Sequence, residues 1–133
     1  MNAKFEPIRI TNLLSEQTRQ SPTASGLRLI CWELSASPTR EWIQLFDNQR
    51  RIPRGRNMLG GREAKVQGRQ IVVDCTPDEI EQQHEYLRHD VAMANTDYKQ
   101  YLDKIEIQAK QAAISRGAEL EQIEGIKSRL NFN

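Results

Sequence analysis

The stretch VVDCTPDEIEQ, residues 72–82, joins a predicted strand to a predicted helix and divides the β-rich part of the chain from its helical part. Thr76 can cap the helix, Pro77 suits its first position, and Glu79 stands three residues after the cap, as in a capping box. Asp78 and Glu79 also place negative charge at the positive end of the helix dipole. The sequence therefore predicts a strand followed directly by a helix.

Downstream of this point, mostly apolar residues recur at alternating spacings of four and three residues, the pattern of a coiled-coil seam or a long amphipathic helix. One series is Ile80, Leu87, Ala94 and Tyr101, and the interleaved series is His84, Val91, Tyr98, Ile105 and Ala112. Gly117 is the first strong helix breaker, so we expect the long helix to end there. A second, shorter helix is predicted over residues 120–130, and it would complete a helical hairpin.

Upstream of this point the pattern is that of a small sheet. Residues 27–35, LRLICWELS, are apolar on both faces, which predicts a central strand. Residues 64–66 and 69–75 read as a hairpin in which Gly68 supplies the positive φ of a tight turn. Residues 5–10 give a weaker strand signal, and the polar residues 12–25 are predicted to form a loop.

A short helix is predicted over residues 37–48, with Ser37 as its cap and Pro38 in its first position. Trp42 and Phe46 fall on one face of this helix, and we expect both, with Trp32, to be large anchors of the core. The predicted fold class is α+β, with a small antiparallel sheet of three or four strands, a short packing helix, and a long C-terminal helix or helical hairpin.

The chain has 133 residues, the size of one ordinary domain, and its net charge of +1 excludes a uniformly basic nucleic-acid binder. Residues 1–72 carry a net charge of +6 and residues 73–133 a net charge of −5. We therefore expect a β-rich segment over residues 1–76 and a helical segment over residues 77–133, sharing one core. Because no apolar run approaches 18 residues and no apolar leader is present, we expect a cytoplasmic protein with no membrane contact.

The sequence predicts no catalytic residue, no metal site and no cofactor. Two cysteines, Cys31 and Cys75, cannot build a disulfide framework or a four-ligand zinc site. Glu81 and His84 form a single Glu-x-x-His pair, whereas di-iron bundles need two such pairs with further carboxylates. A small enzyme with a cysteine nucleophile is an alternative with little support, because both cysteines fall in apolar strands and neither has a local motif. We therefore expect a protein that is not an enzyme.

Residues 50–62, RRIPRGRNMLGGR, form an arginine-rich loop with two interpretations. Its arginines are Arg50, Arg51, Arg54, Arg56 and Arg62. Guanidinium groups bind phosphate bidentately, so the loop is a candidate phosphate or nucleic-acid site. It lacks the aromatic residues on which bases stack, and the acidic C-terminal helices offer ion-pair partners instead. The sequence favours ion pairs and leaves both interpretations open.

The leading functional hypothesis is a non-catalytic cytoplasmic interaction or assembly protein that uses its C-terminal helices. The expected partner is a second copy, giving a homodimer, or another helical protein, because a long apolar stripe would otherwise be exposed. The predicted interface residues are Leu87, Val91, Tyr98, Tyr101, Leu102 and Ile105. The alternative hypothesis is a nucleic-acid or phosphate-binding protein that uses residues 50–62.

Overall fold

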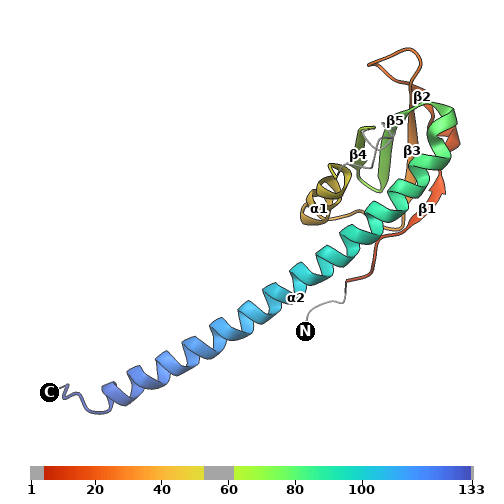
Figure 1. Cartoon of the computed structure of the whole chain (residues 1–133). Coiled ribbons are helices and arrows are strands. Elements are labelled where there is room, and N and C mark those ends of the chain that lie inside the picture. The colour runs from red at the N-terminus through yellow and green to blue at the C-terminus, as the bar shows by residue number, and fades with distance from the viewer. Residues whose placement is uncertain (1–4, 53–61, 133) are drawn as a thin grey trace. The chain divides into compact units, whose positions relative to one another are not determined.

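A computed structural model describes residues 5–52 and 62–132, and it divides into two compact units, Met1–Tyr98 and Lys99–Asn133. Unit 1 holds a sheet, the short helix α1 and the first part of the long helix α2 (Figure 1). Unit 2 holds the remainder of α2. The boundary between the units follows Tyr98, whereas the sequence changes character at residue 76. The first turns of α2 belong to unit 1 because their apolar residues pack in its core.

The fold is α+β, as predicted, and the described residues form an antiparallel sheet of five strands. The strands are β1 Ile10–Leu13, β2 Arg19–Gln20, β3 Arg28–Leu34, β4 Ala64–Gln67 and β5 Gln70–Cys75. Strand β3 is central, since β1 and β2 pair with one side of it and β5 with the other. The weak strand expected over residues 5–10 lies instead at β1, which shares only Ile10 with it, and β2 is an additional strand within the segment predicted as a loop. Both are short and largely exposed, so they carry little apolar signal.

Helix α1 spans Arg40–Arg50 and begins later than the sequence suggested. Its cap is Thr39, whose side chain accepts a hydrogen bond from the Trp42 backbone N–H at 3.2 Å. The predicted cap, Ser37, therefore lies outside the helix. Trp42 and Phe46 are buried as predicted, and their rings stack with centroids 5.6 Å apart.

The core of unit 1 lies on one face of the sheet. Its members from the sheet are Ile30, Trp32, Leu34, Ile71, Val73 and Cys75, and those from the helices are Trp42, Phe46, Leu87, Val91 and Ala94. A smaller cluster of Leu14, Cys31 and Val72, with Leu29 against it, covers the opposite face. The apolar residues on both faces of β3 therefore have partners on both sides, which explains the sequence of this strand.

The two turn signals around β5 are confirmed. Gly68, in the β4–β5 hairpin, has a φ of 59°, in the left-handed region that glycine adopts readily. Thr76 and Glu79 form the predicted capping box, and the backbone N–H of Thr76 donates to Glu79 Oε1 at 2.9 Å. The first turn, Pro77–Glu79, is a 3-10 turn, and α2 follows directly.

Helix α2 runs without a break over Ile80–Lys127, so the predicted stop at Gly117 and the second helix after it are wrong. A glycine commonly ends a helix by adopting the left-handed backbone conformation, with a positive φ. Within the described ranges only Gly68 has a positive φ, so Gly117 keeps the helical conformation. A helical glycine costs about 1 kcal/mol relative to alanine, and the Ala, Glu, Leu and Gln residues around it are strong helix formers. The long-helix form of the prediction is therefore the observed one, not the hairpin.

Candidate interaction surface

Arg50 lies inside unit 1 and is part of a buried polar cluster. Its side chain is 7% exposed and lies 3.3 Å from Asp90 Oδ2, whose side chain is 0% exposed. Nη2 of Arg50 also donates to Gln83 Oε1 at 3.0 Å and to the backbone carbonyl oxygen of Arg62 at 2.6 Å. The first residue of the arginine-rich loop is thus tied to the N-terminal half of α2 rather than displayed to solvent.

Arg62, at the other end of the loop, pairs with Glu79 at the start of α2. Its Nε and Nη2 donate to the two carboxylate oxygens at 3.0 and 2.9 Å, a bidentate geometry. Burial raises the pKa of Glu79, but hydrogen bonds from Arg62 and Thr76 outweigh it and hold the pKa below its usual value of 4.5. Two of the five arginines are therefore in ion pairs with acidic residues of the C-terminal segment.

The lowered pKa of Glu79 makes unit 1 sensitive to acid. The carboxylate stabilises the fold fully above its unfolded pKa of 4.5, and that stability is lost as the pH falls through the lower folded pKa. Glu79→Gln is therefore expected to lower the free energy of unfolding at pH 7, and the difference in this free energy between variant and wild type should become smaller below about pH 4.5. Urea unfolding of both proteins from pH 7 to pH 3 measures this free energy. A difference that is constant with pH would mean that the charge of Glu79 contributes nothing.

Phosphate binding by the other three arginines of the loop, Arg51, Arg54 and Arg56, stays a prediction. Arg51 is exposed, just after α1, and Arg54 and Arg56 lie outside the described residues. Replacing Arg50 together with its neighbours would disturb the core, so a test of phosphate binding has to spare Arg50 and Arg62.

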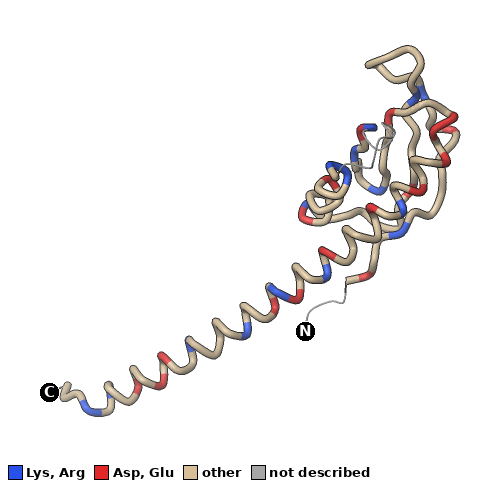
Figure 2. The backbone as a smooth tube through the Cα atoms, viewed as in Figure 1, with Lys and Arg blue, Asp and Glu red and all other residues tan. Residues whose placement is uncertain are grey.

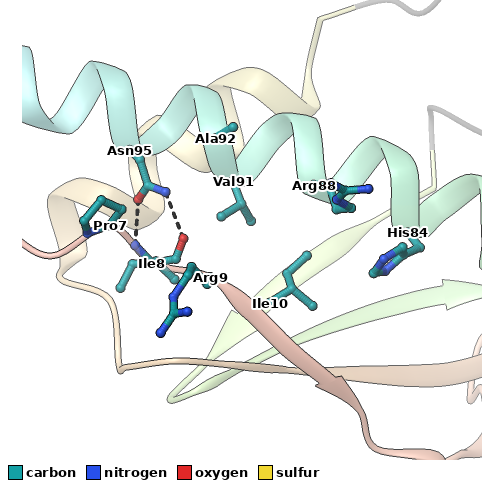
Figure 3. Close-up of a pocket in the computed structure, with 9 residues that line it drawn as sticks. All are labelled: Pro7, Ile8, Arg9, Ile10, His84, Arg88, Val91, Ala92 and Asn95. Atoms are coloured by element: carbon teal, nitrogen blue, oxygen red, sulfur yellow. Dashed lines mark hydrogen bonds between the residues drawn. The ribbon is translucent and has the colours of Figure 1, made fainter.

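A groove of about 380 Å³ lies between the segment that leads into β1 and the first half of α2 (Figure 3). Its residues are Pro7, Ile8, Arg9, Ile10, His84, Arg88, Val91, Ala92 and Asn95. Asn95 accepts from the backbone N–H of Ile8 at 3.0 Å and donates to its carbonyl oxygen at 2.8 Å, as a neighbouring strand would. Its Oδ1 also accepts from the Trp42 indole N–H at 2.9 Å. Asn95 therefore joins the N-terminal segment, α1 and α2, and no local pattern in the sequence indicated this.

His84 has a structural role in the same region. Its Nδ1 accepts a hydrogen bond at 3.0 Å from the indole N–H of Trp32, which is buried. Nδ1 is the acceptor in this contact, so a proton on Nδ1 would break the hydrogen bond. Within the described ranges no three His, Cys, Asp or Glu residues gather in a way that would hold a metal ion.

The two cysteines are free and buried. Burial raises the pKa of the Cys75 thiol to about 11, so this thiol is protonated at neutral pH and is a poor nucleophile. Cys31 lies in the small cluster on the other face of the sheet. These observations give no support to a cysteine nucleophile.

The structure divides the six predicted interface residues into two sets. Leu87, Val91 and Tyr98 are buried in the core of unit 1, so they pack against the chain's own sheet and helices. Tyr101 and Ile105 are exposed, and Leu102 is half-buried. Within the predicted set, exposed or half-buried side chains therefore begin at residue 101 rather than at Leu87.

Unit 2 carries an exposed apolar face that we call the unit 2 stripe. It consists of Leu102, Ile105, Ala109, Ala112, Ile123, Ile126 and, in the turn after α2, Leu130. These residues follow the alternating four-and-three spacing, and those within α2 lie on one face of the helix. Ile105, for example, is 43% exposed. The sequence indicated the first part of this stripe and assigned the second part to a separate helix.

A comparison of this chain with protein-family models, curated proteins and solved structures finds no match. No helix within the described ranges combines the length and the apolar character needed to cross a bilayer. The exposed apolar side chains of the unit 2 stripe are therefore the feature that bears on function.

Proposed function

We propose that this chain is a non-catalytic interaction protein that assembles through the unit 2 stripe. The observation that carries the proposal is the exposure of large aliphatic side chains on one helical face, among them Ile105, Ile123 and Ile126. Contiguous apolar surface of this kind marks interaction sites in proteins that are otherwise polar. The seam spacing is that of a coiled coil, so the expected partner is another helix with the same spacing.

Self-association is the favoured form of this assembly. A second copy supplies an identical stripe of equal length, and closed twofold pairing is the commonest way for a chain to bury such a face. The proposal includes the cytoplasmic location expected from the sequence, with which two free cysteines are compatible.

The proposal predicts that charge within the stripe separates the assembly. Ile105→Glu combined with Ile123→Glu places carboxylates in the buried seam and should convert the assembled protein to a species of 15.4 kDa. Light scattering at tens of micromolar measures the mass of each variant.

Ile107→Glu with Ile114→Glu is the matched control. These two residues are also exposed, at 55% and 72%, but lie about 160–180° around the helix from Ile105 and hence off the stripe. The control should keep the wild-type mass. Equal masses for both double variants would mean that the stripe is not the assembly surface.

A further inference from the structure

We infer that two copies of this chain pair through the unit 2 stripe in antiparallel orientation, with Arg116 of each copy opposite Glu119 of the other. This inference rests on the proposed function and adds the direction and the register of the pairing. It follows from the two residues that interrupt the stripe and from the sizes of the residues that flank them.

The stripe follows one continuous seam with a single polar interruption. Between Ala112 and Ile123, the alternating spacing places Arg116 and then Glu119 in the seam. Both are exposed in unit 2. A charged residue in a coiled-coil seam lowers stability but selects the partner and the register that provide the opposite charge.

A parallel, in-register pair does not give Arg116 and Glu119 partners of opposite charge. Each residue would then face its own copy, so Arg116 would meet Arg116 and Glu119 would meet Glu119 within an apolar seam. Like charges opposed at an interface strongly disfavour association. Ala109 and Ala112 would also face their own copies, leaving gaps where large side chains are absent on both sides.

An antiparallel pair with Arg116 opposite Glu119 resolves both problems at once. The same register sets Ala112 opposite Ile123 and Ala109 opposite Ile126. Each small residue of the first half thus meets a large residue of the second half, the alternation that fills a core. Ile105 then lies opposite the end of α2 of the other copy, which is followed by the turn that carries Leu130.

The positions beside the seam agree with this register. In an antiparallel pair each flank meets the same flank of the other copy, so Glu106 lies opposite Lys127, and Ala113 lies opposite Leu120. Within its own helix Glu106 is 3.4 Å from Lys110, an exposed contact that can coexist with a second cation.

The distribution of charge along unit 2 also favours the antiparallel pair. Basic and acidic residues both occur along this part of α2 (Figure 2). Residues 99–116 hold four basic and two acidic residues, whereas residues 117–133 hold two basic and three acidic residues. The net charges of +2 and −1 attract when the halves run in opposite directions and repel when like halves meet.

Spin labels on single cysteines distinguish the two directions. Lys104→Cys and Ala118→Cys occupy equivalent, exposed positions two heptads apart on the outer side of the helix. In the antiparallel register, the two labels at position 104 are separated by roughly 27 residues of helix, about 40 Å, while those at position 118 lie side by side. Cys31 and Cys75 are buried, so we expect the label to react only with the introduced cysteines in the folded protein.

A long distance at position 104 with a short one at position 118 supports the inference. Equal short distances at both positions would show a parallel pair, which overturns the antiparallel register and leaves the proposed self-association intact. A protein that stays monomeric in both labelled forms and in the wild type would overturn the proposed self-association, and the inference with it.

Charge reversal tests the register itself. Arg116→Glu should weaken self-association by at least about tenfold, because Glu then faces Glu119 of the second copy. Adding Glu119→Arg should restore it, because the opposite charges face each other again with the order reversed. A double variant as weak as the single one would show that these two residues do not meet across the interface.

Discussion

Replacement of Asp90 by alanine is expected to lower the free energy of unfolding by about 3–5 kcal/mol. The carboxylate lies 3.3 Å from the Arg50 guanidinium, and both side chains are almost fully excluded from water. Breaking a buried pair is costly because the remaining charge loses its counter-charge while staying out of solvent. Urea unfolding monitored by tryptophan fluorescence measures the loss.

The matched control is Glu85→Ala, on the same helix. Glu85 pairs with Arg88 at 3.5 Å, but both side chains are more than half exposed. Removing such a surface pair should change stability by no more than about 1 kcal/mol. If Asp90→Ala cost no more than Glu85→Ala, the buried cluster around Arg50 would not be a structural element of unit 1.

Replacement of Phe46 by alanine is expected to cost about 3–5 kcal/mol as well, through a different mechanism. Phe46 is fully buried and stacks on Trp42, so truncation removes apolar contacts and leaves a cavity in the core. A loss of this size should lower Tm by about 10 °C or more.

Ile52→Ala is the control for this change. Ile52 lies just after α1 and is largely exposed, so its truncation should leave Tm within about 2 °C of wild type. A Phe46→Ala protein that also melts within that range would show that α1 contributes little to the core.

Local patterns predicted the parts of the fold that depend on neighbouring residues. The capping box at Thr76 and the Gly68 turn were visible because a few adjacent side chains decide each of them. The burial of Trp42 and Phe46 followed from helical spacing. The weak strand signal at residues 5–10 overlaps β1 only at Ile10, and β2 carries no apolar signal. Both strands are short, largely exposed and held by pairing with β3 rather than by an apolar pattern.

Contacts between residues far apart in the sequence could not be predicted from local patterns. Arg50 and Asp90 are 40 positions apart, and Asn95 bonds to Ile8 across 87 positions. The sequence showed that acidic helices were available to the arginines, but not which arginines would be buried. Glycine is a weak helix former, which predicts a stop at Gly117, but the strong helix formers around it continue α2 through this position.

The long seam is divided between residues that the chain's own core buries and residues that are exposed. The seam continues past Tyr98 with one irregular step, two successive spacings of four at Ala94, Tyr98 and Leu102, and mostly apolar residues lie on both sides of that step. Sequence alone therefore did not show where the chain's own core stops covering the seam. The structure places that point at Tyr98, the last residue of unit 1. The residues beyond it are the ones on which the proposed assembly depends.

The mass of the unaltered chain in solution tests the central claim most directly. Light scattering across a concentration series up to tens of micromolar is expected to show a species of twice the chain mass of 15.4 kDa. A species of 15.4 kDa at every concentration would contradict self-association through the unit 2 stripe.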